Sequence, residues 1–302
     1  MDLKSKIVLI YGPTASGKSD FAINLAKKIK GEIINADSMQ VYKDLKILTA
    51  RPLKKDYQKV KHHLYGFQNG RKNFSTGDWL KLAIKKIHEI KNRKKVPILV
   101  GGTGLYFKAL VEGLVEIPNI PLVFRNKVRK LQKNLGQKKF YKKLLKIEPH
   151  LTNLIKSTDT QRSIRAYEVK IFTKKSIVEW YGNTESDFKK NDFFKVIIDF
   201  PRTKLVEKIH FRTVQMIERG AIMEVGKFLK LKISKDKSIS KTIGVHEIEQ
   251  YLKKKIDKKY VIEKISIKTR QYAKRQMTWT RGHMMSWKKI KTNRLNNFLK
   301  KI

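Results

Sequence analysis

The sequence predicts an α/β fold: a parallel sheet flanked by helices, with an all-helical domain inserted into the chain. Three features support this prediction. Short apolar runs recur, each the length of a strand that is buried on both faces. The first run leads through a glycine-rich loop directly into a helical pattern. Basic amphipathic helices then replace the strand pattern before it resumes, so residues 1–117 and 196–302 form the predicted core and residues 118–195 the predicted insertion.

Basic side chains dominate the composition of this 302-residue chain. It carries 70 Lys and Arg against 26 Asp and Glu, a net charge of +44, which favours a polyanionic partner such as nucleic acid. Lysine enrichment of solvated faces is a second explanation, because 56 of the cations are Lys, spread over every segment, and 14 are Arg. The arginines are therefore more informative, since a guanidinium group forks onto phosphates and stacks on bases.

Cysteine is absent, which excludes a disulfide framework and thiol chemistry and is consistent with a reducing compartment such as the cytoplasm. The first motif follows the N-terminus so closely that no signal peptide is expected. No apolar run approaches the roughly 20 residues of a membrane-spanning helix. The seven histidines are scattered, and the adjacent pair His62 and His63 points in two directions, so a shared metal is not expected. A monomer is the default expectation.

The most specific single motif is G-x-x-x-x-G-K-S at residues 12–19, between the apolar run at 7–10 and a helix that begins near Ser19. This context is typical of a P-loop NTPase-like sheet, in which backbone N–H groups surround phosphate oxygens at the positive end of a helix. Lys18 adds a full charge, and the Ser19 hydroxyl is placed to bind Mg²⁺. The predicted phosphate-binding residues are Gly12, Pro13, Thr14, Ala15, Ser16, Gly17, Lys18 and Ser19. The motif does not specify whose phosphates it binds.

Two further strands lead to polar residues at the carboxyl edge of the predicted sheet, where ligands bind in open α/β folds. Residues 33–34 lead to Asp37 and Ser38. An acid there is either a general base or metal-linked carboxylate, or an ordinary helix N-cap. Residues 96–100 lead to a glycine turn in which Thr103 could donate to a phosphate.

Two helical segments carry informative cations. Arg162 and Arg165 lie three residues apart on one face of a predicted helix, where a solvated face and contact with an RNA backbone are both open explanations. Residues 261–279 predict a long helix with Tyr272 and Trp279 in the core. Its basic face, interleaved with aromatic residues in a manner that suits RNA, carries Arg270, Lys274 and Arg281.

Taken together, these motifs resemble those of the tRNA dimethylallyltransferase family, also called tRNA isopentenyltransferases or IPP transferases. The matching stretches are GPTASGKS (12–19), NADSMQVY (35–42), LTARP (48–52), HHL (62–64), VPILVGGTGLYFKAL (96–110), QRSIR (161–165), PRTKL with FRTVQMIERG (201–220) and TRQYAKRQMTWTR (269–281). They span nearly the whole chain in one order. Departures from the family pattern at Leu48, at His246 and over residues 66–75 concern contacts with tRNA and not the chemistry.

The resemblance implies transfer of a dimethylallyl group from dimethylallyl diphosphate to N6 of the adenosine on the 3′ side of a tRNA anticodon, with Mg²⁺ as cofactor. It implies that Lys18, Mg²⁺ on Ser19, Thr103 and Arg212 stabilise the leaving diphosphate, while Asp37 accepts a proton from the adenine amine. The catalytic residues it implies are therefore Asp37, Lys18, Thr103 and Arg212. The implied contacts with the anticodon stem-loop are Asp37, Ser38, Met39, Gln40, Thr103, Arg125, Gln161, Arg162, Ser163, Ile164, Arg165, Arg270, Lys274 and Arg281.

Two other functions share some of these features. A small-molecule or nucleotide kinase would use the same loop for ATP. The strand at residues 96–100 lacks the terminal aspartate of the magnesium-binding strand in an ATPase, and Asp199, which ends the strand at 194–199, is the alternative magnesium ligand. A non-catalytic RNA-binding protein with a vestigial loop would be equally basic. Only the transferase changes tRNA covalently.

Overall fold

The computed structural model describes residues 3–181 and 184–302, which divide into two compact units. The sheet unit contains the chain up to Val111 and again from Asp187, and the helical unit contains Glu112–Ser186. The sequence places the insertion at residues 118–195. The observed unit begins and ends earlier in the chain, because Phe188 already packs against the core of the sheet unit.

Within the described residues, six strands form one parallel sheet in the order β3-β2-β4-β1-β5-β6. β1 and β4 are buried along their whole length, as their uninterrupted apolar sequences predict. The sequence does not predict β3, because a pair of histidines carries no strand pattern; its residues pair with Ile33 and Ile34. The strands are β1 Ile7–Tyr11, β2 Gly31–Asn35, β3 His62–His63, β4 Val96–Gly101, β5 Phe193–Asp199 and β6 Lys288–Lys291.

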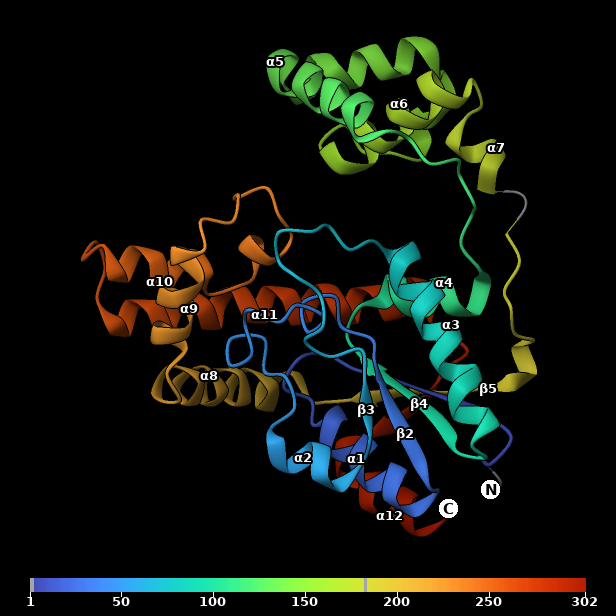
Figure 1. Cartoon of the computed structure of the whole chain (residues 1–302), viewed down its shortest axis with the longest axis vertical. Coiled ribbons are helices and arrows are strands. Elements are labelled where there is room, and N and C mark those ends of the chain that lie inside the picture. Colours follow the sequence, from blue (N-terminus) through green and yellow to red (C-terminus); the bar gives the residue numbers. More distant parts are fainter. Residues whose placement is uncertain (1–2, 182–183) are drawn as a thin grey trace. The chain divides into compact units, whose positions relative to one another are not determined.

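Helices cover both faces of the sheet, because alternate residues of each strand point to opposite sides. Ile7, Leu9 and Tyr11 pack against α3 (Thr76–Asn92) and α4 (Gly104–Glu112). Val8 and Ile10 pack against α1 (Lys18–Lys28) and α12 (Leu295–Lys300) on the other face (Figure 1). These three layers confirm the predicted α/β fold, and the loops that follow the strands meet at its carboxyl edge.

Four further helices share an apolar cluster beside the sheet, and they lie together in Figure 1. They are α8 (Arg202–Glu218), α9 (Ala221–Lys230), α10 (Val245–Leu252) and α11 (Lys258–His283). Their cluster contains Ile217, Val225 and Ile248, with Leu45 from the loop after β2. α11 is longer at both ends than the helix predicted at residues 261–279. The remaining short elements of this unit are α2 (Lys54–Lys59), η2 (Lys190–Asp192), η3 (Ile239–Lys241) and η4 (Thr292–Arg294).

The helical unit has an apolar core of its own, in which Phe140, Leu144 and Val169 are fully buried. Gly136, with φ 70° and ψ 163°, leaves the helical conformation and divides α5, which confirms the separate helices predicted on either side of it. The unit contains α5 (Leu122–Ile147), η1 (Pro149–Asn153), α6 (Thr160–Thr173) and α7 (Ile177–Tyr181). Across the described part of both units, no helix has the length and apolar character needed to cross a bilayer.

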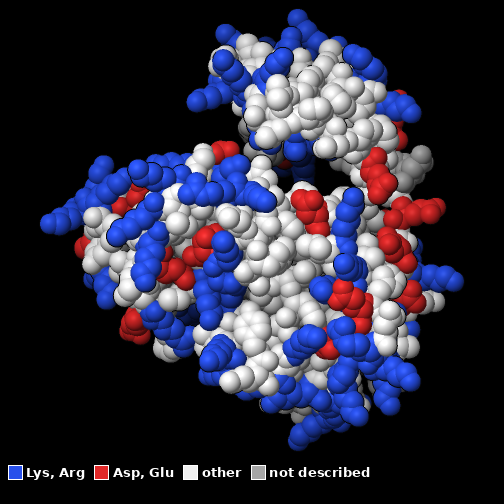
Figure 2. All heavy atoms as spheres, viewed as in Figure 1, with Lys and Arg blue, Asp and Glu red and all other residues white. Residues whose placement is uncertain are grey.

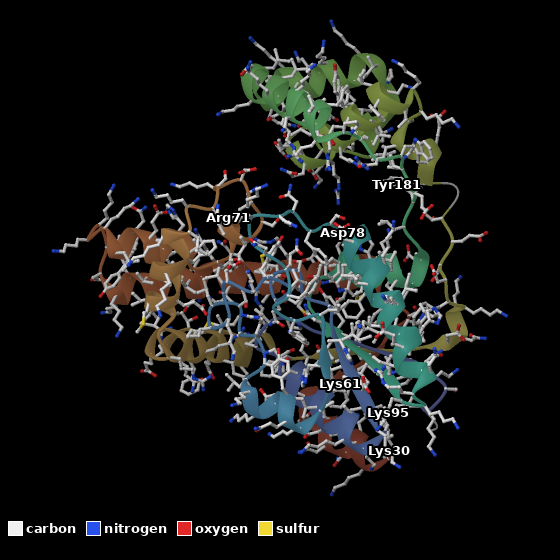
Figure 3. The ribbon with its side chains drawn as sticks, in the orientation of Figure 1. Lys30, Lys61, Arg71, Asp78, Lys95 and Tyr181 are labelled. Atoms are coloured by element: carbon white, nitrogen blue, oxygen red, sulfur yellow. The ribbon has the colours of Figure 1, made fainter. Side chains whose placement is uncertain are left out.

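Lys and Arg side chains are spread over the visible surface of each unit instead of forming one patch (Figure 2). Several of them lie far from the carboxyl edge of the sheet. Lys30, Lys61 and Lys95 immediately precede β2, β3 and β4, so they stand at the amino edge, where Figure 3 shows them together. All three are exposed. The large net charge therefore does not by itself locate a binding site.

Candidate active site

The glycine-rich loop connects the end of β1 to α1 at the carboxyl edge of the sheet. Gly17 is the N-cap of α1 with φ 79°, a left-handed conformation that favours glycine. In the described structure, the N–H groups of Gly17, Lys18 and Ser19 have no acceptor, as expected for the first turn of a helix. The hydroxyl of Ser16 is buried and also has no partner. These donors and the positive helix end form a cradle for an anion.

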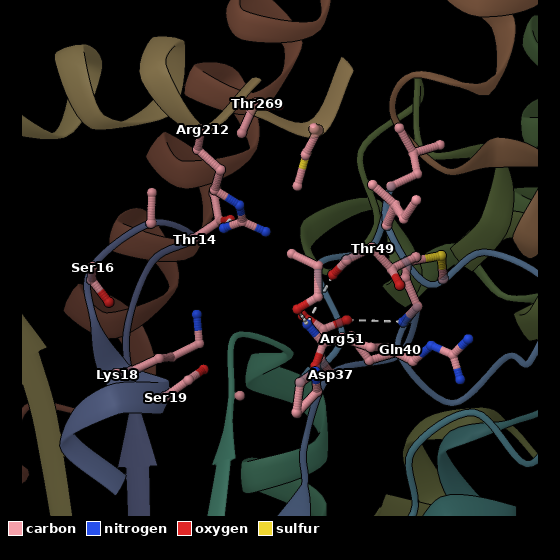
Figure 4. Close-up of a pocket in the computed structure, with 18 of the residues that line it drawn as sticks. Thr14, Ser16, Lys18, Ser19, Asp37, Gln40, Thr49, Arg51, Arg212 and Thr269 are labelled. Atoms are coloured by element: carbon pink, nitrogen blue, oxygen red, sulfur yellow. Dashed lines mark hydrogen bonds between the residues drawn. The ribbon is translucent and has the colours of Figure 1, made fainter. Parts of the chain in front are cut away.

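Two cations meet at this cradle. The Lys18 Nζ donates to the carbonyl oxygen of Pro13 at 3.2 Å, and Arg212 of α8 donates to the Thr14 hydroxyl at 2.7 Å. Burial lowers the pKa of Lys18 to about 8, although the charge of Asp37 opposes the shift. Burial also lowers the pKa of Arg212, again against Asp37. Lys18, Arg212 and Asp37 face one common space (Figure 4), where a bound anion would restore the favourable environment that burial removes from the cations.

Asp37 is held by the backbone around it. Asn35, which is fully buried at the end of β2, accepts from the Asp37 N–H at 2.9 Å and donates to the Asp37 and Leu64 carbonyl oxygens at 3.0 Å each. The Asp37 Oδ1 accepts from the Met39 N–H at 2.9 Å. No helix begins at this position, so the carboxylate caps a turn. The alternative interpretation of Asp37 as a helix N-cap is therefore wrong. Its Oδ2 has no hydrogen-bond partner in the described residues.

Thr103 joins the glycine turn after β4 to the Asp37 loop. Its Oγ1 accepts from the Ser38 N–H at 3.0 Å and donates to the Ser38 Oγ at 3.3 Å. Its own N–H donates to the Ala36 carbonyl oxygen at 3.2 Å. The glycine at position 101 is needed here, because a Cβ would lie 1.9 Å from that same carbonyl oxygen. Thr103 thus supports the Asp37 loop. It does not line the cavity next to the phosphate loop, so its predicted donation to a phosphate stays a prediction.

Gln276 of α11 is a buried residue that sequence reasoning missed. Its Oε1 accepts from the Thr14 N–H and its Nε2 donates to the Gly102 carbonyl oxygen, each at 2.9 Å. Its backbone carbonyl accepts from the Tyr11 hydroxyl at 2.9 Å. One amide side chain therefore joins the phosphate loop to the glycine turn. The partners lie 262 and 174 residues away along the chain, and no local pattern signals such a contact.

A cavity of about 960 Å³ opens from the cradle, and every residue around it belongs to the sheet unit. This is large for a diphosphate alone and lies at the upper end of small-molecule sites. Ser38, Met39 and Gln40 line it next to Asp37, and Gln40 donates to the Thr49 and Ala50 carbonyl oxygens at 2.9 and 3.1 Å. The other walls include residues 46–53, part of α8 between Lys208 and Met216, Ser238, residues 241–243, and Thr269, Tyr272 and Arg275 of α11.

The basic face predicted on α11 does not reach this cavity. Arg270, Lys274 and Arg281 are exposed and none of them lines it, whereas Thr269, Tyr272 and Arg275 do. The packing of Ile265 into the apolar cluster of α8–α11 sets the rotation of the helix. Tyr272, expected in the core, therefore lies in the wall of the cavity. Trp279 packs against the core as predicted.

Two of the predicted RNA-binding arginines of the helical unit, Arg125 and Arg165, surround a buried acid together with Arg129, which was not predicted. Glu168 lies 3.5 Å from Arg125, 4.0 Å from Arg129 and 3.8 Å from Arg165. Burial raises the pKa of Glu168 even against these three cations. Because one carboxylate cannot neutralise three guanidinium groups, the cluster keeps an excess of positive charge that suits a phosphate backbone.

The predicted stretch at residues 161–165 is divided between surface and core. Ser163 is fully buried, and its hydroxyl donates to the Asp159 carbonyl oxygen at 2.7 Å. Ile164 packs into the apolar core of the unit. Gln161 and Arg162 are exposed, and Arg162 lies 3.4 Å from Asp159. The residues that solvent reaches are therefore Gln161, Arg162 and, in part, Arg165.

Oxygen groups at the cavity suit a magnesium ion that is bound mainly through phosphate. Ser19 and Asp37 both line the cavity and offer a hydroxyl and a carboxylate, the hard ligands that Mg²⁺ prefers. Among the described residues no cluster of three or more His, Asp or Glu could hold a metal by itself. Asp199, the alternative magnesium ligand, is not part of the cavity wall.

Known proteins resemble this chain along its whole length. A family model described as IPP transferase matches residues 40–283. A tRNA dimethylallyltransferase of Pelagibacter ubique (strain HTCC1062) is 60% identical over 302 residues, which cover 100% of this chain and 96% of that protein.

Two solved structures support the same relationship. The full-length tRNA isopentenylpyrophosphate transferase of Bacillus halodurans is 30% identical with a TM-score of 0.69, over 98% of this chain and 95% of that one. A eukaryotic dimethylallyltransferase acting on tRNA is 26% identical with a TM-score of 0.83, over 95% of this chain and 74% of that one. The chain belongs to the IPP transferase family.

Proposed function

We propose that this protein transfers a dimethylallyl group from dimethylallyl diphosphate to N6 of the adenosine on the 3′ side of a tRNA anticodon. The allylic C1–O bond breaks, the C1–N6 bond forms, and diphosphate and one proton are released. The observation that carries the proposal is the cavity in which Lys18 and Arg212 face Asp37 across one space (Figure 4). Membership of the family and the tRNA enzymes among its relatives support the choice of donor and acceptor.

The diphosphate of the donor binds in the loop of residues 12–19. The first-turn N–H groups of α1 and the Ser16 hydroxyl donate to its oxygens, and Lys18 and Arg212 neutralise its charge. Negative charge on this group grows as the C–O bond breaks. Donors that are already fixed around this group therefore stabilise the transition state more than the bound donor. Ser19 would hold Mg²⁺ together with phosphate oxygens, and the ion would supply further charge neutralisation there.

Asp37 is the group that contacts the adenine amine, which accepts the dimethylallyl group. The exocyclic amine of adenine is a weak nucleophile, so its position beside the allylic carbon matters more than its basicity. One oxygen of Asp37 accepts from the Met39 N–H, and the second has no partner among the described residues, which leaves it to orient the amine and to accept its proton. Thr103 keeps the Asp37 loop in place through Ser38.

The adenosine reaches Asp37 only if it leaves the stack of the anticodon loop, because the carboxylate lies inside a cavity. Ser38, Met39 and Gln40 contact the unstacked base. Arg125, Arg162 and Arg165 of the helical unit, with Gln161, bind the phosphate backbone of the stem-loop. The reaction takes place in the cytoplasm, where tRNA is available, and we expect a monomer.

Mass spectrometry of tRNA tests this proposal directly. After incubation with the purified protein, Mg²⁺ and dimethylallyl diphosphate, one adenosine next to the anticodon is expected to gain one dimethylallyl group. Lys18→Ala is the control and is expected to abolish the gain. Transfer of radiolabelled phosphate from ATP, with no change in the tRNA, would establish the kinase instead.

A further inference from the structure

A stripe of side chains on α8 faces the cavity and takes no part in the chemistry described above. Lys208, Phe211 and Gln215 of α8 and Arg219, the C-cap residue of that helix, follow one another at spacings of three, four and four residues, which places them along one face. All four line the cavity. Arg212, the residue that holds Thr14, lies in the neighbouring row of the same helix.

Phe211 is the unusual member of this stripe. Its side chain is 62% exposed, and it joins none of the apolar clusters of the sheet unit. The inward-facing residues of the same helix, Leu205, Ile209 and Ile217, are buried. The α8 helix therefore does not need Phe211 for packing. A large aromatic ring is left in water at the wall of a binding cavity, where a ligand could cover it.

The groups beside Phe211 indicate what kind of ligand that is. Lys208 and Arg219 are exposed cations, and the side chains of Gln215 and Arg219 have no hydrogen-bond or ion-pair partner within the described residues. The carboxylates of α8, Glu207 and Glu218, do not line the cavity. Proteins bind unpaired nucleotides with groups of these kinds: cations contact the phosphates, an amide contacts the base edges, and an open aromatic ring stacks on a base.

We propose that Phe211 is a stacking platform for an unpaired base of the RNA, adjacent in the loop to the adenosine that enters the cavity. Lys208 and Arg219 neutralise the phosphates on either side of that base, and Gln215 hydrogen-bonds to its edge. The dimethylallyl tail is not the ligand of this ring, because a hydrocarbon tail gains most in an enclosed apolar wall and Phe211 is open and flanked by cations. The identity of the RNA rests on the proposed function; the stacking itself does not.

Binding of an RNA hairpin that carries the anticodon loop tests the platform. Phe211→Ala is expected to raise the Kd of the hairpin about tenfold, and Phe211→Trp to restore it, because stacking depends on the ring and not on phenylalanine as such. The Kd of inorganic diphosphate is expected to stay within twofold in both variants. Met223→Ala on α9 is the matched control, since Met223 is 65% exposed, apolar and outside the cavity wall.

Abasic hairpins identify the stacked base. Each nucleotide next to the target adenosine is replaced in turn by an abasic one, and at one position Phe211→Ala is expected to cause no further loss of affinity. An unchanged hairpin Kd in Phe211→Ala, or an equal loss with every abasic hairpin, would overturn the platform. A weaker Kd for diphosphate would assign the ring to the donor instead. Wild-type protein that binds the hairpin but never prenylates it would refute the proposed function and leave this test intact.

Discussion

At the scale of single residues, the site depends on bringing partly buried charges of both signs to one cavity. Lys18 and Arg212 are held by oxygen atoms of the phosphate loop, and burial lowers the pKa of both. Asp37 opposes both shifts and is fixed by Asn35 and the Met39 N–H. The site thus contains two cations and one anion, and it favours a ligand that brings further negative charge.

Replacement of Asp37 tests its role as the proton acceptor. Asp37→Asn keeps an oxygen for the Met39 N–H but cannot take a proton, so turnover is expected to fall by roughly 10²–10⁴. Affinity for diphosphate is expected to be equal or higher, because a negative charge is removed from the cavity. Single-turnover prenylation of tRNA and calorimetry with diphosphate measure the two quantities. Turnover near that of the wild type would remove Asp37 from the chemistry.

The pKa of Lys18 predicts how donor binding depends on pH. Below pH 8 its amine is charged and attracts the diphosphate; above pH 8 the free protein loses this charge. Affinity for diphosphate is therefore expected to fall as the pH rises through about 8, by up to tenfold per pH unit. Lys18→Met is expected to bind weakly at every pH and to lose this inflection. An inflection that persists in Lys18→Met would assign it to another group.

At the scale of elements, the active site is the meeting point of loops that follow β1, β2 and β4 with two helices from the second half of the chain. α8 supplies Arg212, and α11 supplies Gln276 and the wall residue Tyr272. α9 contributes Glu224, whose carboxylate accepts from the N–H groups of residues 46–48 at 2.7 to 3.0 Å. Each contact fixes a loop at the cavity.

The sequence reveals the loops but not the helices that hold them. The positions of the phosphate loop and of Asp37 at the cavity were predictable, because each follows directly from the end of a strand. Gln276 and Glu224 were not, because their partners lie more than 170 residues away and only the packed structure brings them together. The core placement of Tyr272 was wrong for the same reason, since tertiary packing decides which residues of α11 reach the cavity.

Gln276 offers a test of how α11 controls the phosphate loop. Gln276→Leu is close in volume but removes both hydrogen bonds, so the Thr14 N–H and the Gly102 carbonyl lose their partners. We expect kcat to fall roughly tenfold or more, because Arg212 bonds to Thr14 and loses its position when Thr14 is no longer held. In an Arg212→Ala background the same change is expected to have little further effect. Additive losses in this double-mutant cycle would show that Gln276 acts independently of Arg212.

Glu224 tests the loop that carries Thr49 and Ala50, the acceptors of Gln40. Glu224→Ala removes a charged acceptor from three backbone N–H groups and is expected to cost about 2 kcal/mol in the free energy of unfolding. The KM for tRNA is expected to rise. Glu249→Ala on α10 is the control, because its pairs with Lys235 and Lys253 lie at the surface and contribute about 0–1 kcal/mol. Denaturant unfolding measures the loss of unfolding free energy in both variants. Equal losses in Glu224→Ala and Glu249→Ala would show that Glu224 does not stabilise the loop.

At the scale of the whole molecule, the net charge of +44 raises the question of which cations bind RNA. Lysines cover regions that no ligand of the cavity touches, including the amino edge of the sheet (Figures 2 and 3). The salt dependence of binding separates the two groups, because each phosphate that a cation neutralises adds a fixed increment to the slope of log K against log[salt]. A lysine on a solvated face adds nothing to this slope.

Two triple variants of equal charge make the comparison. Lys208→Gln, Arg219→Gln and Lys241→Gln together remove three cations from the cavity wall, and the slope for the anticodon hairpin is expected to become shallower by about 2 to 3. Lys30→Gln, Lys61→Gln and Lys95→Gln remove three exposed cations from the amino edge and are expected to leave the slope unchanged. Fluorescence titrations from about 0.05 to 0.3 M salt measure both. If the slope of log K against log[salt] becomes shallower by the same amount in both variants, the charge of this protein acts as a diffuse field. The cations of the cavity wall then contribute no more to RNA binding than those of the amino edge.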